Sequence, residues 1–163
     1  MLIVKWFVIV VVVLVVVAVA LGQLGFLQGT PPTDLGVRDG KLKPPSMTEN
    51  SVTSQAALYP DHPQRKYADI APLPVKGEGP ATIAQIKAIV AGMDGAKVIK
   101  SEPGYLYAQF TTKLMKYVDD VEFWFDPAAN VIHVRSASRV GRGDLGVNRK
   151  RIEAVRAVLD PPK

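Results

Sequence analysis

The sequence predicts an α+β fold: a two-layer domain in which an antiparallel sheet of about four strands carries two helices on one face, behind a single N-terminal transmembrane helix. Three observations predict this architecture. An apolar run opens the chain, apolar residues recur at helical spacing near residues 82–93 and 149–159, and four segments of alternating polarity lie between them. Two amphipathic helices need an apolar sheet face to cover, and the alternating segments supply one.

The opening apolar run is long enough to cross a bilayer once. No polar residue occurs from Trp6 to Leu21, and residues 2–4 extend the run to about twenty residues. A cleaved signal peptide is the alternative, because Ala18-Val19-Ala20 fits the small-x-small cleavage pattern. We favour an anchor, since apolar residues continue through Phe26-Leu27. The short N-terminal head predicts a single-pass protein of the inner (cytoplasmic) membrane, with its C-terminal domain on the periplasmic side.

Proline and glycine mark the division of the remaining chain. They are dense between residues 28 and 80, a composition that excludes helices and inner strands. We expect residues 1–27 to form the anchor, 28–49 a Pro/Gly-rich tether, and 50–163 the α+β domain.

A helix and a hairpin open the regular part of the domain. Apolar residues recur on one helical face at residues 82–93, and glycines follow as a stop signal. Strand-like segments at 96–101 and 105–112 are separated by Glu102-Pro103-Gly104, a turn signal, so we expect them to pair.

A second hairpin and a helix complete the pattern. The segments 118–126 and 131–138 alternate in polarity around a short connection, which predicts two paired strands. The last helix is predicted from apolar residues at helical spacing, namely Ile152, Val155, Val158 and Leu159.

Alternation assigns the strand side chains to two faces of the sheet. The residues expected toward the helices are Leu106, Ala108, Phe110, Val121, Phe123, Phe125, Ile132 and Val134. The opposite face is expected to carry Tyr105, Tyr107, Gln109, Asp120, Glu122, Trp124, His133 and Arg135. This polar and aromatic face is the first place to look for function.

Three carboxylates, Asp119, Asp120 and Glu122, occur within four residues, and alternation places the last two on one face. Two close carboxylates can raise one another's pKa and perform acid–base catalysis. Pairing with arginine is the more common arrangement, because Arg135 lies across the hairpin and opposite charges on neighbouring strands stabilise a sheet. No catalytic residue is assigned.

Other catalytic and metal chemistry has little support in the sequence. The two histidines, His62 and His133, are far apart, and no third ligand is spaced with them, so we predict no metal site and no cofactor. Cysteine is absent, which excludes a disulfide framework and a thiolate nucleophile. Ser136 and Ser138 lie outside any Gly-x-Ser-x-Gly motif.

The segment 139–156 contains six basic residues and two acidic ones. With Asn148 as the N-cap, the three cations at 149–151 would open the last helix, where the helix dipole disfavours positive charge. Three arrangements would remove this penalty: pairing with the carboxylate cluster, an external anion bound at the helix start, or an earlier N-cap at Asp144. The candidate residues for the ion pairs or the anion site are Arg135, Arg139, Asn148, Arg149 and Arg151.

Three runs, KYVDDVEFWFD, VIHVRSASRVGRGDLGVNRKRIEAVR and the preceding ENSVTSQA, resemble the family known as domain of unknown function 1499. The resemblance covers residues 50 to about 159. It implies a compact α+β domain, often behind a membrane anchor or export signal in bacteria, with related proteins in plastids. It implies no activity, because the family lacks an established reaction.

The chain keeps many residues of the family pattern and departs from it at one position. The residues that match are Asp119, Asp120, Glu122, Phe123, Arg135, Ser136, Ser138, Arg139, Gly141, Asp144, Gly146, Asn148, Arg149 and Arg151. Many relatives have Asn-Cys-Val where this chain has Asn50-Ser51-Val52, a departure that argues against a thiol mechanism here.

We therefore expect a membrane-anchored extracytoplasmic domain that is not an enzyme but an accessory or assembly subunit of a membrane protein complex. The net charge of +5 is not attributed to nucleic acid, because no RNA-binding or helix-turn-helix pattern is present. Anionic lipid is a further candidate partner. The alternative is a small enzyme or binding module for an anionic ligand, whose converging side chains would be Asp120, Glu122, His133, Arg135 and Arg139.

Overall fold

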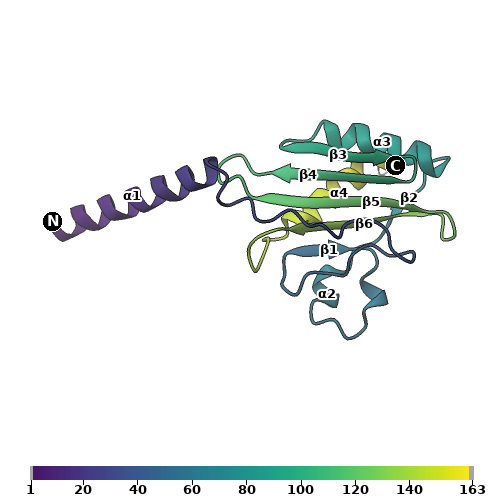
Figure 1. The fold of residues 1–163 in the computed structure, drawn as a ribbon, viewed down its shortest axis with the longest axis horizontal. Coiled ribbons are helices and arrows are strands. Elements are labelled where there is room, and N and C mark those ends of the chain that lie inside the picture. Colours follow the sequence, from purple (N-terminus) through teal and green to yellow (C-terminus); the bar gives the residue numbers. More distant parts are fainter. Residues whose placement is uncertain (1, 162–163) are drawn as a thin grey trace.

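The structure is a computed structural model that describes residues 2–161. An antiparallel sheet of six strands carries two long helices on one face, and an apolar helix projects from one end of the domain (Figure 1). The predicted α+β class is confirmed. The predicted count of about four strands is wrong, because two short strands from the Pro-rich region extend the sheet.

The projecting helix is α1 (Leu2–Gln23), and none of its apolar window is buried within the protein. Its 22 residues span about 33 Å at the rise of an α-helix, enough for the hydrocarbon core of a bilayer. The helix is therefore long and apolar enough to cross a membrane, a description that a signal sequence also meets. Valine is compatible with a helix there, because lipid offers the backbone no other hydrogen-bond partner.

The centre of the sheet is a meander of four consecutive strands, joined in the order β3-β4-β5-β6. These strands are β3 (Ala96–Glu102), β4 (Tyr105–Thr111), β5 (Val118–Asp126) and β6 (Val131–Ser138). The two predicted hairpins are present, with Glu122 opposite Arg135 across the second one.

The two additional strands, β1 (Ser51–Thr53) and β2 (Leu73–Pro74), both pair with β6 at the edge of the sheet. An edge position tolerates Pro74, because a proline there removes no ladder bond that an inner strand would need. Two short helices, η1 (Ala56–Leu58) and α2 (Arg65–Ala68), lie between these strands. The expectation that no helix forms in this region is therefore wrong for these single turns.

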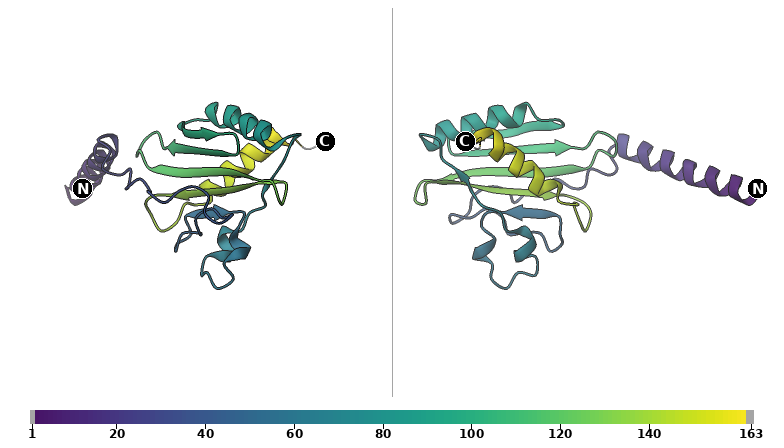
Figure 2. Two further views of the ribbon diagram at one scale, coloured as in Figure 1. Left: turned by 45° about the vertical axis from the view of Figure 1, so that its right-hand side comes forward. Right: turned by 180° about the vertical axis from the view of Figure 1, so that it is seen from behind.

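Two helices, α3 (Gly79–Ala91) and α4 (Val147–Leu159), cover one face of the sheet, as the view from behind shows (Figure 2). α3 begins three residues before the predicted start, with Pro80 in its first turn. All eight residues predicted for the core face belong to the hydrophobic core or pack against it. Periodicity therefore predicted this layer correctly.

The opposite face of the sheet is covered by an extended segment, residues 29–47, which Figure 1 shows crossing in front of β5 and β6. Leu42 in this segment is only 1% exposed, and its backbone N–H donates to the side-chain oxygen of Gln55 over 2.8 Å. The backbone N–H of Gly36 donates to Glu122 over 2.7 Å. Much of the predicted tether thus packs against the domain.

Candidate functional site

The start of α4 is capped by Asp144, which lies in the loop before the helix. Its carboxylate accepts hydrogen bonds from the backbone N–H groups of Gly146, at 2.9 Å, and Asn148, at 3.0 Å, and from the hydroxyl of Tyr67. Gly146 occupies the N-cap position with a φ of 78°, so the prediction that Asn148 is the N-cap is wrong. Asp144 thus supplies a negative charge at a helix start that carries three cations.

The side chain of Asn148 is buried beneath the helix and joins it to the sheet. Its Oδ1 accepts hydrogen bonds from Ser136 Oγ, at 2.5 Å, and Arg151 Nη1, at 2.7 Å. Its amide donates to the carbonyl of Asn50 and to Ser138 Oγ, at 3.1 and 3.0 Å. One side chain therefore connects β6, α4 and the residue before β1.

Arg151 extends this cluster to the first of the three β5 carboxylates. Its Nη2 lies 2.5 Å from Asp119 Oδ2, and both side chains are buried. Its guanidinium carbon lies 4.5 Å from the centroid of the Phe110 ring, a cation–π contact. Arg151 is therefore part of the interior of the domain.

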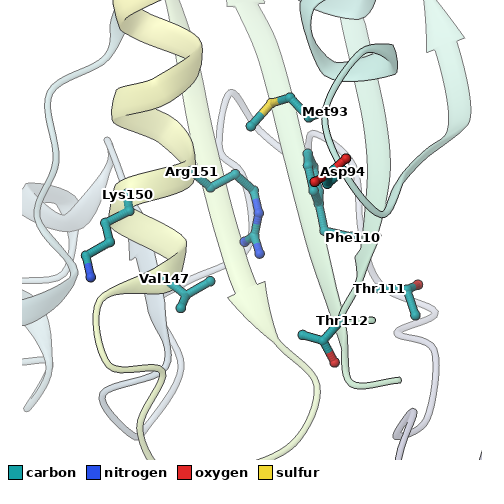
Figure 3. A pocket seen from close by; sticks show the side chains of 8 residues that line it. All are labelled: Met93, Asp94, Phe110, Thr111, Thr112, Val147, Lys150 and Arg151. Carbon is teal, nitrogen blue, oxygen red and sulfur yellow. The ribbon is translucent and has the colours of Figure 1, made fainter. Parts of the chain in front are cut away.

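The other two cations at the start of α4 point elsewhere. Arg149 donates to the backbone carbonyls of Tyr67 and Asp69, at 2.7 and 2.8 Å, and so joins α4 to α2. Lys150 is exposed, and Figure 3 shows its side chain directed away from Arg151.

On the opposite face, Arg139 binds the second carboxylate through two parallel hydrogen bonds. Its Nε lies 2.8 Å from Asp120 Oδ2 and its Nη2 lies 2.7 Å from Asp120 Oδ1. The hydroxyl of Tyr107 donates to the same carboxylate over 2.5 Å. The carboxylate holds the pKa of Arg139 above its ordinary value, and burial followed by this hydrogen bond raises the pKa of Tyr107.

The third carboxylate, Glu122, is 0% exposed. Its Oε1 accepts hydrogen bonds from the hydroxyl of Tyr105 and the backbone N–H of Gly36, each at 2.7 Å. Its Oε2 lies 4.0 Å from Arg135 Nη1 and has no hydrogen-bond partner among the described residues. Burial raises the pKa of Glu122 despite these favourable partners, and burial lowers the pKa of Arg135.

His133 lies apart from these pairs, at the other end of β6. Its Nδ1 is 2.9 Å from Ser54 Oγ, its Nε2 is 3.6 Å from Asp126 Oδ2, and its ring stacks on Trp124 with centroids 5.5 Å apart. Burial lowers the pKa of His133, although Asp126 acts in the opposite direction. Within residues 2–161, no group of three or more acidic or histidine side chains is placed to hold a metal ion.

The five side chains of the predicted ligand site do not share one pocket. A pocket of about 670 Å³ between residues 30–34 and 43–47 has Asp120, Arg135 and Arg139 in its lining. Glu122 and His133 do not line it. The three carboxylates thus form three separate pairs with arginines, one of them under α4 and the others on the opposite face of the sheet, and His133 belongs to none of them.

Two further pockets open at the end of the domain nearest α1. One, of about 370 Å³, lies between the end of α3 and the start of α4; Figure 3 shows Met93, Phe110 and Val147 in its wall and Arg151 directed toward Phe110. The other, of about 420 Å³, shares Val147 and continues along the loop before α4. These pockets lie on the helix side of the sheet, beside the start of α4, where an anion site was one of the arrangements expected from the sequence.

Two polar residues of the site were not predicted from the sequence. Asn50 donates to the carbonyls of Gly141, at 2.9 Å, and Ser138, at 3.3 Å, and its buried Oδ1 has no partner among the described residues. Tyr67 binds Asp144 from α2. The signal for Asn50 was its place in the ENSVTSQA run, but no spacing linked that run to residues 138–148.

Comparison with known proteins places these clusters within one family. The family model described as "Protein of unknown function (DUF1499)" matches residues 41–159, which include all six strands and both long helices of the domain. No curated protein and no solved structure matches the chain. The model covers well over half of the chain, together with every ion pair of the β5 carboxylates. The chain therefore belongs to the DUF1499 family of proteins of unknown function.

Proposed function

We propose that the protein is a single-pass inner-membrane protein whose periplasmic domain is a non-catalytic accessory or assembly subunit of a membrane protein complex. The observation that carries the proposal is the internal pairing of charge. Each of the three buried carboxylates of β5 faces an arginine of β6, of the loop after β6, or of α4.

Internal pairing leaves these groups poorly suited to act on a substrate. A general acid or base must come within hydrogen-bond distance of the reacting group. Asp119, Asp120 and Glu122 are all buried and already bind donors of the fold. Removing one partner of such a pair leaves an uncompensated buried charge. In this chain these groups support the fold, which agrees with a structural rather than a catalytic domain.

The test is recovery of a partner from native membranes. The full chain, tagged at its C-terminus, would be cross-linked in the membrane, extracted in several mild detergents and purified. We expect a defined partner protein in stoichiometric amount. A variant in which α1 is replaced by an unrelated apolar span is the control, because it keeps the membrane location while changing the span. A protein that stays solitary under every extraction, with no cross-linked species, would contradict the accessory role.

An anionic-ligand module is the second candidate, and the 670 Å³ pocket is the observation that favours it. Its lining includes Arg135, Arg139 and the partly exposed Lys43, which pairs with Asp34 over 2.7 Å. Phosphorylated and carboxylated compounds would be screened for a rise in the Tm of the full chain. A rise in the wild type that is absent in Lys43→Ala supports this candidate, and no rise with any compound removes it.

A further inference from the structure

The end of α1 contacts the folded domain directly. The side-chain amide of Gln23 donates to the backbone carbonyls of Leu114, at 2.8 Å, and Lys113, at 3.3 Å. Gly22 is buried, and a Cβ added to it would lie 2.6 Å from the carbonyl oxygen of Met115. The loop 112–117 therefore lies at the level where the apolar helix ends.

A second loop lies at the same end of the domain. A Cβ added to Gly29 would lie 2.8 Å from a side-chain carbon of Val140, so the chain leaving α1 packs against the loop 139–146. Both loops line the 420 Å³ pocket, and Figure 1 shows them at the end of the sheet from which α1 projects. We call these two loops together the anchor end.

Apolar side chains are exposed at the tips of the anchor end. Leu114 is 60% exposed and Leu145 is 93% exposed. Leu145 also has a φ of 52°, a conformation that leucine rarely adopts. The Asp144 carboxylate before it accepts hydrogen bonds from the backbone N–H groups of Gly146 and Asn148 after it, which close this turn of the loop. A single exposed leucine is ordinary on a protein surface. Leu114 and Leu145, however, lie beside the end of an apolar span. Both leucines and the span can therefore contact lipid together.

The charged side chains of the anchor end are mostly basic. Lys113 and Arg142 are exposed and Lys116 is partly exposed, and none of the three forms an ion pair within residues 2–161. The acidic residue of the two loops is Asp144, whose carboxylate is engaged by Tyr67 and by backbone N–H groups. Basic residues next to a membrane span are attracted to anionic headgroups.

We propose that the anchor end docks on the anionic lipid surface of the membrane that α1 spans. Leu114 and Leu145 insert among the lipid chains, while Lys113, Lys116 and Arg142 contact headgroup phosphates. The inference rests on the membrane anchor of the proposed function and not on the presence of a protein partner. Docking fixes the orientation of the domain relative to the membrane.

The absence of cysteine makes the proposal directly testable, because one introduced cysteine is the only thiol to label. The full chain would carry an environment-sensitive fluorophore at Leu114→Cys, Leu145→Cys or Val158→Cys, and would be reconstituted into vesicles of phosphatidylcholine and phosphatidylglycerol. Val158 is the matched control, since it is an exposed apolar residue at the far end of α4. We expect nitroxide-bearing lipids to quench the labels at 114 and 145, and aqueous iodide to quench the label at 158. Equal iodide quenching at all three positions would overturn the proposal.

Charge variants test the role of the headgroups. Reversing three cations of the anchor end (Lys113→Glu, Lys116→Glu and Arg142→Glu) is expected to shift the equilibrium between docked and undocked domain by about a hundredfold or more, at about fivefold per cation lost. Pure phosphatidylcholine vesicles and high salt are expected to act in the same direction. The matched control reverses three exposed cations elsewhere (Arg65→Glu, Lys66→Glu and Lys87→Glu), and equal effects of the two triple variants would contradict docking at this surface.

Flotation separates failure of the docking from failure of the anchor. A chain that does not float with vesicles has no membrane anchor, which overturns the proposed function and the docking together. A chain that floats while its labels at 114 and 145 stay open to iodide keeps the anchor and overturns only the docking. Docking in vesicles without any other protein supports the inference whether or not a partner complex exists.

Discussion

Arg151, the fifth residue of α4, and Asp119 at the start of β5 form a buried ion pair with a closest nitrogen–oxygen distance of 2.5 Å. The pair joins the helix layer to the sheet at the end of the domain nearest α1. The same guanidinium donates to Ser136 and Asn148, at 2.9 and 2.7 Å. A cation at an unfavourable place in the helix dipole is therefore compensated by three acceptors beneath it.

Removing one partner of this pair is expected to destabilise the domain strongly. Arg151→Met and Asp119→Leu should each lower the free energy of unfolding by about 3–5 kcal/mol, because each leaves an uncompensated buried charge. The double variant should lose much less than the sum, since it buries no unpaired charge. Chemical unfolding of the four proteins forms a double-mutant cycle. Additive losses would show that the two side chains do not depend on each other.

The Asp144 cap should make the domain sensitive to acid. Burial alone would raise its pKa, but the hydrogen bonds from Tyr67, Asn148 and Gly146 outweigh burial and hold the pKa of Asp144 below its ordinary value. A folded-state pKa below the unfolded one stabilises the domain above the unfolded-state value, and the contribution is lost as the pH falls through the folded-state value. Asp144→Asn should cost about 1 kcal/mol at neutral pH and less at low pH. Unfolding curves between neutral and acidic pH would measure this, and a pH-independent difference between the proteins would argue against it.

Glu122 should give the opposite dependence on pH. Burial raises its pKa above the ordinary 4.5, so the folded state binds more protons than the unfolded state between the two values. The free energy of unfolding then decreases as the pH rises through this window. Glu122→Gln cannot take up the proton, so wild-type stability should fall relative to this variant as the pH rises above about 4.5. If the free energies of unfolding of the two proteins change in parallel with pH over that range, burial does not raise the pKa of this carboxyl group.

The helix side of the domain could be predicted from the sequence, and the covered polar face could not. Alternation along β5 placed Val121 and Phe123 in the core, because a period of two follows directly from strand geometry. The partners of Glu122 could not be found this way, because one is the backbone N–H of Gly36, which any residue except proline offers. Similarly, β2 has only two residues, too few to show an alternating pattern in the sequence. It is a strand because its backbone pairs with β6.

The start of α4 is a second place where sequence patterns alone could not predict the contacts. The sequence allows a cap at Asp144 and pairing of the cations with carboxylates as separate arrangements, and the structure contains features of both. Propensity favoured Asn148 as the N-cap, but its side chain is used by Ser136 and Arg151 under the helix. Tertiary hydrogen bonds thus decided the position of the helix start.

The turn before β3 should not tolerate a side chain at Gly95. This residue has a φ of 72°, and an added Cβ would collide with the carbonyl oxygen of Thr111 on β4. Gly95→Ala is therefore expected to lower the free energy of unfolding by at least about 1–3 kcal/mol. Gly104→Ala is the control, because a Cβ there has nothing within 4 Å and the residue has no positive φ. Equal stability of the two variants would show that the strand β4 can move to accommodate the side chain.

The close contact between α1 and the loop 112–117 should depend on the small size of Gly22. A leucine at this position would push the backbone of Met115 away, because even a Cβ would lie 2.6 Å from its carbonyl oxygen. The loop contains Lys113 and Lys116, both cleavage sites for trypsin, so Gly22→Leu should speed tryptic cleavage of the folded full chain in detergent micelles. Ala20→Leu, at an exposed position of the same helix, is the control and should leave the rate unchanged. Detergent removes the bilayer, so the rate reports the helix–loop contact alone. Equal cleavage in Gly22→Leu and the wild type would mean that the end of α1 does not hold the loop, and the docking surface would then lack a fixed position relative to the span.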